Sequence, residues 1–263
     1  MRLSKGSYRF DLEKRPHGAW VPGRTEFCGP APSGASHPTL GDLPPLSFVG
    51  IAEERGLIAQ LSDFVVDSVC QFLASADFPW VAVNISAIQF LRDDFVDDIL
   101  ARLHRHGLEP KRLQLEITES TLNDNREQVE RSLSRLREAG LTITLDDFGT
   151  GFSSMNYLRQ YPIDKIKIDR SFVAQLGTTP ESDAIVRAII AMARAMRKEV
   201  VAEGVETIEQ RDHLAALGCH QLQGFLLSEA VPAAALLSQR LAAMAAAMRL
   251  GDNPKANVKR LRQ

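Results

Sequence analysis

Residues 141–147 of the chain read Leu141-Thr142-Ile143-Thr144-Leu145-Asp146-Asp147, and a glycine follows at position 149. This apolar run is short and ends in acidic residues, a pattern typical of a buried strand that is followed by a polar loop. Five further segments show the same pattern, at residues 81–85, 112–118, 165–169, 200–203 and 220–225. The sequence therefore predicts at least six short buried strands.

Helical segments alternate with these strands. Apolar residues repeat with the 3.6-residue period of a helix in residues 57–73 and again in residues 185–196. Thr207 and Gln210 form a capping box at the start of another helix, and Gly218 stands where that helix is expected to end. Repeated strand-helix units of this kind predict an α/β fold with helices packed around a parallel sheet.

The N-terminal region, residues 1–45, differs from the rest because prolines interrupt it at positions 16, 22, 30, 32, 38, 44 and 45. We expect mostly loop there. Six strands are too few for a barrel, so the first strands must come from this region. Proline is tolerated in sheets mainly at edges, first positions and bulges, and we expect irregular or incomplete closure. Residues 46–249 form the predicted barrel, and residues 250–263 a solvated basic tail.

Composition excludes several classes of function. The chain has 263 residues, 44% of them hydrophobic, with a formal net charge of -2, so it can bury a large core but lacks the basic excess that binds a nucleic-acid polymer. Its three cysteines are odd in number and show no paired spacing, which argues against a disulfide framework or a zinc site. No run approaches the roughly 18 apolar residues of a membrane span. We expect a cytoplasmic chain without a membrane anchor.

Oxygen-bearing side chains stand near the ends of the predicted strands, at Asn84, Glu116, Asp146, Asp147 and Glu203. In a β/α barrel these strand ends face one mouth. The carboxylates would repel one another unless cations lay among them, and Mg²⁺ or Mn²⁺ prefers such ligands. Asp146 can bridge two ions while Asp147 reaches the second. Lys167 ends another strand, where it can hold an attacking water or a phosphate oxygen.

A glycine-rich segment, Gly149-Thr150-Gly151, follows the paired acids. It has two interpretations from the residues alone: a tight turn that uses glycine for positive φ, or a flexible lid over the predicted site.

Four motifs together resemble those of EAL domains: Asp146-Asp147-Phe148-Gly149-Thr150-Gly151, Lys167-Ile168-Asp169, Ala202-Glu203-Gly204-Val205-Glu206 and Gln223-Gly224. The similarity begins near Phe48 and runs to about Val231. The resemblance implies a modified TIM (β/α)8 barrel, often dimeric, that hydrolyses the bacterial messenger cyclic di-GMP to linear pGpG with Mg²⁺ or Mn²⁺.

The resemblance also implies residue roles. One metal ion would be held by Asn84, Glu116 and Asp146, and the second by Asp146, Asp147 and Glu203. The residues implied to act in catalysis are Lys167, Glu203 and Asp147, with Lys167 beside the attacking water. Glu119 would steady the lid loop, residues 147–154. The positions implied to line the substrate site are Glu206 and Gln223.

The first strand departs from the family pattern. The Glu-Ala-Leu triplet that names the family falls on Pro30-Ala31-Pro32, and the basic residue that normally follows falls on Gly34. This alignment implies a lost metal ligand, a lost phosphate anchor and impaired activity. Glu26 is a substitute ligand if a few inserted residues follow it, and otherwise a solvated loop residue.

Three functions therefore compete: a working phosphodiesterase, a non-catalytic cyclic di-GMP receptor, and a scaffold that binds a protein partner. Retention of the ligands on the other strands favours the first two, whereas Pro30 and Gly34 favour the receptor over the enzyme. Sensory or GGDEF-type domains, fused or separate, and a second copy of the chain are the expected protein partners.

Overall fold

The structure is a computed structural model that describes residues 2–3, 7–14, 20–27, 35–37, 41–43, 49–76, 78–123, 125–150, 155–227 and 231–232. Six parallel strands lie side by side in chain order: β6 (Val81–Asn84), β7 (Leu113–Thr118), β8 (Thr142–Phe148), β9 (Lys165–Ile168), β10 (Glu199–Ala202) and β11 (Gln221–Leu222). All six predicted strands are confirmed, with bounds that differ by one to three residues.

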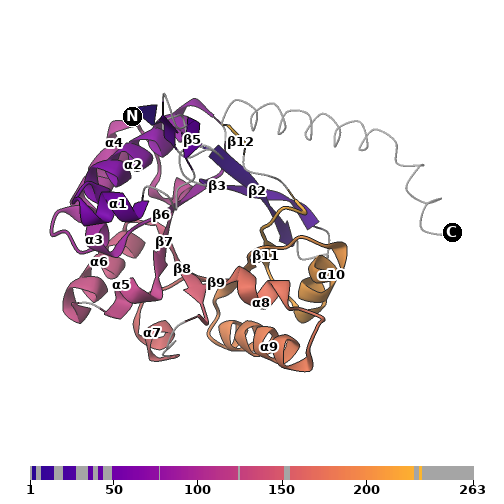
Figure 1. Ribbon diagram of the computed structural model, residues 1–263. Coiled ribbons are helices and arrows are strands. Elements are labelled where there is room, and N and C mark those ends of the chain that lie inside the picture. Colours follow the sequence, from indigo (N-terminus) through magenta and orange to yellow (C-terminus); the bar gives the residue numbers. More distant parts are fainter. Residues whose placement is uncertain are drawn as a thin grey trace, which may run out of the picture.

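Two N-terminal strands close the sheet into a ring. Strand β3 (Trp20–Phe27) runs parallel to β6, and β2 (Ser7–Lys14) pairs antiparallel with both β3 and β11. Eight strands within the described part of the chain thus form a barrel in which β2 is reversed (Figure 1). The predicted modified TIM barrel is confirmed. The short strand β12 (Val231–Pro232) pairs with β2. Three other short strands form a separate sheet: β1 (Arg2–Leu3), β4 (Ala35–His37) and β5 (Gly41–Leu43).

The expectation of mostly loop over residues 1–45 is wrong for β2 and β3. Pro22 pairs with Leu12 directly after a register shift in the β2–β3 ladder, and proline is tolerated at such an irregularity. The closure is nevertheless irregular as expected, since β3 meets β6 through two residue pairs, Thr25 with Val81 and Glu26 with Ala82.

Helices surround this ring on its outer side (Figure 1). They are α1 (Val49–Glu54), α2 (Ile58–Ser75), α3 (Ala87–Phe90), α4 (Phe95–Arg105), the 3-10 helix η2 (Pro110–Arg112), α5 (Glu119–Asn123), α6 (Arg126–Glu138), α7 (Met155–Gln160), α8 (Arg170–Ala174), α9 (Pro180–Ala195) and α10 (Ile208–Leu217). Helix α10 has the predicted capping box at Thr207 and ends at Gly218, whose φ is 87°. None of the described helices has the length and hydropathy needed to cross a membrane. The predicted basic tail, residues 250–263, lies outside the described residues.

On β7, apolar residues that face the core alternate with polar residues that face the barrel interior. On β7, Leu113, Leu115 and Ile117 are fully buried in the apolar core, while the residues between them are the polar Gln114 and Glu116. Because successive strand residues point to opposite faces, the second set faces the barrel interior. On β7 the polar residues therefore face the barrel interior, and Glu116 lies toward the carboxyl end of the strand.

Candidate active site

Lys167 on β9 lies at the centre of a charged cluster inside the barrel. It is 2% exposed, and its Nζ donates a hydrogen bond of 2.7 Å to Glu116 Oε2 on β7. The same Nζ lies 3.4 Å from Asp146 Oδ1 on β8 and forms an ion pair with Glu203, which directly follows β10. One buried cation therefore partly neutralises three carboxylates from three strands.

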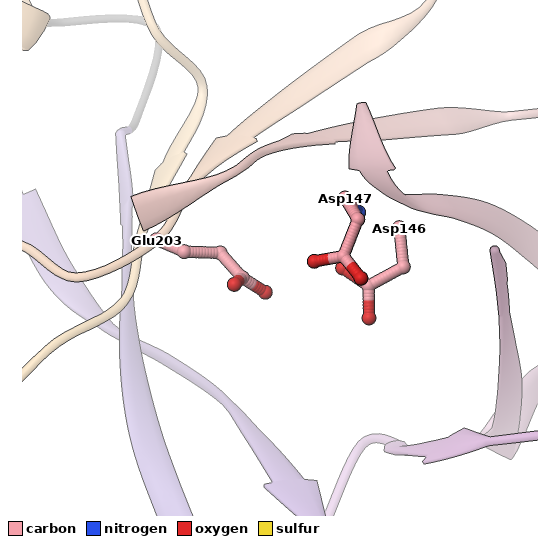
Figure 2. Close-up of side chains that lie close together, drawn as sticks. All are labelled: Asp146, Asp147 and Glu203. Atoms are coloured by element: carbon pink, nitrogen blue, oxygen red, sulfur yellow. The ribbon is translucent and has the colours of Figure 1, made fainter. Parts of the chain in front are cut away.

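Three carboxylates form a group that can hold a metal ion: Asp146, Asp147 and Glu203. One oxygen from each lies within 4.8 Å of the others, and Figure 2 shows the two aspartates facing Glu203 across the mouth. Three negative charges at this spacing exceed the charge of Lys167. Oxygen donors so close together suit a hard divalent cation, so the residues fit the predicted metal.

A backbone irregularity at Asp147 lets two consecutive residues serve one site. Neighbours on a regular strand point to opposite faces, but Asp147 has a φ of 53° and the β8–β9 register shifts between Leu145 and Phe148. The Asp147 N–H donates to the Asp146 carboxylate at 2.9 Å. Burial, with the nearby negative charges of Asp146 and Asp169, raises the pKa of Asp147 above its usual value.

Asn84 and Glu116 lie at the same level of neighbouring strands. They are register partners in the β6–β7 pairing, so both belong to the interior face. Glu116 is held by Lys167, whereas Asn84 is exposed at the end of β6. The structure thus brings both predicted ligands to the mouth, outside the group of three carboxylates.

Glu119 contacts the start of the predicted lid. Its Oε1 accepts a hydrogen bond of 3.2 Å from the Gly149 N–H. A side chain at position 149 would lie 2.9 Å from the Phe172 ring, and the φ of Gly149 is 100°, so glycine is required there. The Thr150 hydroxyl donates to the Asp147 carbonyl at 2.9 Å. Residues 151–154 of this loop lie outside the described residues.

A cavity of about 520 Å³ opens beside the carboxylates. Its lining residues are Asp147, Thr150, Asp169, Arg170, Glu203, Gly204, Glu206, Gln223, Gly224 and Phe225. Glu206 and Gln223, predicted to line the site, are among them. Arg170 and Phe225 were not predicted, although their position directly after the motifs at residues 167–169 and 223–224 is a signal that could have identified them.

The turn at Gly224 packs tightly against the segment that follows Glu203. A Cβ at position 224 would lie 2.2 Å from the Val205 carbonyl oxygen. The Val205 N–H also donates to the Gln223 carbonyl at 2.9 Å. This close approach of two backbones holds two walls of the cavity together.

Glu26 belongs to β3, the first of the parallel strands. Its register partner is Ala82, two residues before Asn84 on β6. Glu116 and Asp146 show the same register offset of two residues, because Asp146 pairs with Thr118, two residues after Glu116. The Pro30-Ala31-Pro32 segment and Gly34 lie outside the described residues, so loss of the usual glutamate stays a prediction.

Comparison with known proteins identifies relatives of the chain. The EAL domain family model matches residues 32–230. The bifunctional diguanylate cyclase/cyclic di-GMP phosphodiesterase MucR of Pseudomonas aeruginosa is 42% identical over 207 residues, which are 77% of this chain and 30% of that protein. Cyclic di-GMP phosphodiesterase NbdA of the same species is 43% identical over 205 residues, covering 76% and 26%. The chain thus spans between about a quarter and a third of these relatives.

Solved structures show the same fold. The PaMucR phosphodiesterase in its c-di-GMP complex superposes with a TM-score of 0.80 and 38% identity, covering 88% of this chain and 93% of that one. The EAL enzyme Bd1971, bound to cAMP and cyclic di-GMP, gives a TM-score of 0.83 and 30% identity over 90% of this chain and 65% of its own. With a family match over more than half of its length and relatives above 40% identity, the chain belongs to the EAL domain family.

Proposed function

We propose that this chain is a metal-dependent phosphodiesterase domain that hydrolyses cyclic di-GMP to linear pGpG. The observation that carries the proposal is the group of Asp146, Asp147 and Glu203 beside Lys167, at the edge of a cavity of about 520 Å³. The names of MucR and NbdA and the nucleotide in the PaMucR complex support the choice of substrate.

The chemistry would be divided among the residues as follows. Asp146, Asp147 and Glu203 would hold Mg²⁺ or Mn²⁺, with Glu116 and Asn84 as further ligands. Bound divalent ions supply a more acidic water and neutralise charge on the phosphate. In the hydrolysis a water oxygen bonds to phosphorus, one phosphorus–oxygen ester bond breaks, and the released 3′ oxygen takes a proton.

Lys167 would orient the attacking water and stabilise negative charge on the phosphate oxygens. Its buried Nζ is fixed between Glu116 and Glu203, so little reorganisation is needed when charge develops. Glu119 would act indirectly, by holding Gly149 and with it the start of the lid loop.

Glu26 is our candidate for the first-strand carboxylate. Its register pairing with Ala82, two residues before Asn84 on β6, supports this choice. If it is correct, the family's glutamate has shifted in sequence position, and the chain keeps a full set of acids. If the acid is absent instead, the domain is a cyclic di-GMP receptor with little turnover.

Hydrolysis of cyclic di-GMP by the purified chain, followed by chromatography of the products, tests the proposal. We expect pGpG to form with Mg²⁺ or Mn²⁺, and Glu26→Gln to lower turnover at least about tenfold, the scale of losing one supporting ligand. Glu54→Gln on the exposed side of α1 is the control and should leave turnover unchanged.

A repaired variant separates the alternatives. It replaces Pro30-Ala31-Pro32 with Glu-Ala-Leu and carries Gly34→Arg. If this variant turns over at least about tenfold faster than the parent, and Glu26→Gln has no effect, the ligand was lost and Glu26 does not replace it. Binding without turnover identifies a receptor, and absence of binding favours a scaffold.

The name of one relative supports a proposal about a protein partner. MucR is named for both a cyclase and a phosphodiesterase activity, which supports a GGDEF-type domain, fused or separate, as a partner of this chain. We also propose a homodimer and a cytoplasmic location, and both are open to direct measurement.

A further inference from the structure

Arg170 is the basic residue among the described residues that line the cavity. Four acids line the same cavity: Asp147, Asp169, Glu203 and Glu206. Arg170 is exposed, and its guanidinium makes no hydrogen bond or ion pair with any residue that the structure describes. A cation that stands among four carboxylates without pairing to them has its donors available for a ligand.

Gly204 determines where Arg170 stands. A Cβ at position 204 would lie 2.6 Å from the Arg170 Cβ and 3.3 Å from its Cα, and the φ of Gly204 is 67°. The segment after Glu203 can therefore approach Arg170 only because residue 204 has no side chain. On the other side, Asp169 Oδ1 accepts from the Ser171 N–H at 2.9 Å and fixes the backbone around Arg170. Arg170 is thus held at the border of the carboxylate group.

We propose that Arg170 binds a phosphate group of the cyclic dinucleotide at the end of the cavity next to Glu203. Arg170 can do so only if the chain binds that ligand, so the inference rests on the proposed function. The guanidinium fork donates two parallel hydrogen bonds to two phosphate oxygens, a geometry that lysine cannot reproduce. Nothing in the motifs of the first strand is needed for this contact.

The charges of the cavity support a phosphate over a base as the partner of Arg170. The four acids repel an anionic ligand, and divalent ions offset that repulsion only at the carboxylate group. A second positive charge beside Glu203 lowers the cost of bringing phosphates there. Phe225, which is 62% exposed and lines the same cavity, offers the ring surface on which a guanine can stack.

The test is equilibrium binding of cyclic di-GMP to the parent and to Arg170→Ala, Arg170→Lys and Arg187→Ala. Ca²⁺ replaces Mg²⁺, because it neutralises carboxylates without the strict octahedral geometry of Mg²⁺, and chromatography verifies that the nucleotide stays intact. We expect Arg170→Ala to raise Kd about 10- to 100-fold, the scale of a lost hydrogen bond to a charged group. Arg170→Lys keeps the charge and should raise Kd less.

Arg187, exposed on α9 away from the cavity lining, is the matched control and should bind like the parent after substitution. If the parent binds and Arg170→Ala binds equally well, the role of Arg170 is overturned while the proposed function stands. If the parent does not bind, both are overturned. A lysine variant that binds as tightly as the parent shows that charge alone suffices, and it overturns the two-bond contact with the phosphate. If Arg170→Ala melts at a lower temperature, Arg170→Gln repeats the test.

Discussion

Lys167 Nζ and Glu116 Oε2 lie 2.7 Å apart inside the barrel, although their strands are not neighbours and 51 positions separate them in the sequence. Lys167 is 2% and Glu116 5% exposed, so water solvates neither charge well and each side chain stabilises the charge of the other. A buried ion that loses its partner destabilises the fold far more than an exposed one.

Lys167→Met should therefore lower the free energy of unfolding of the metal-free protein by about 3 to 5 kcal/mol, because it leaves buried carboxylates without a cation. Adding Mg²⁺ or Mn²⁺ should restore part of this loss if the same carboxylates bind metal. Urea unfolding with and without metal measures both effects. Lys111→Met is the control, since its side chain is 73% exposed and pairs with the exposed Glu109, and it should change stability little.

Asp146→Asn should weaken binding of Mg²⁺ or Mn²⁺ more than Glu206→Gln does. Asp146 belongs to the group of three carboxylates, whereas Glu206 lines the cavity outside that group. A carboxylate that bridges two ions affects both when it is neutralised. Isothermal titration of each variant with the metal alone gives the comparison, and equal effects would contradict a two-metal site that contains Asp146.

Gly224→Ala should destabilise the protein by about 1 to 3 kcal/mol, the usual range for overpacking, and raise the KM for cyclic di-GMP. The added Cβ would overlap the Val205 backbone, at 2.2 Å from its oxygen, and force two cavity walls apart. Gly50→Ala on α1 is the control, because a Cβ added there would meet nothing within 4 Å and alanine favours a helix. Thermal melting and steady-state kinetics compare Gly224→Ala with the Gly50→Ala control. Equal melting temperatures of the two variants would contradict the predicted overpacking at Gly224.

The stability of the protein should fall as pH rises from about 9 toward 11, in part because of Cys70. Cys70 is fully buried, and burial together with the charge of Asp67 raises the pKa of its thiol to about 11. Because the folded-state pKa exceeds the unfolded one, the neutral thiol contributes stability below the unfolded pKa, and that contribution is lost as pH rises through the folded value.

Urea unfolding of the parent and of Cys70→Ala across this pH window measures the contribution of Cys70. The variant should be less stable near neutral pH, because it leaves a cavity, but its stability should depend less on pH. Identical pH dependence in the two proteins would exclude Cys70 as a titrating group. Reaction with a thiol reagent should likewise be slow until the protein unfolds.

Local sequence determined the strands, the helices and the kinds of ligand. Each signal involves only residues close together in the sequence, so its pattern can be read directly. These signals are the alternation of apolar and polar residues around Glu116 and Lys167, the capping box at Thr207 and the glycine at position 218. The same pattern placed an oxygen donor at the end of successive strands. Neither the fold class nor the chemistry of the donors required knowledge of distant contacts.

Only the tertiary structure decided how these residues meet. The proline-rich N-terminal segment forms β2 and β3 because pairing with β6 and β11 satisfies its backbone, and local propensity did not reveal this. The positive φ of Asp147 turns two consecutive acids toward one mouth. The curled sheet brings Lys167 to acids on β7 and β8 and to the acid that directly follows β10. Arg170 reaches the cavity because Gly204 lets two loops approach. Each of these arrangements depends on strand register and on close packing between segments far apart in the chain. The periodicity of the local sequence carries no information about such contacts.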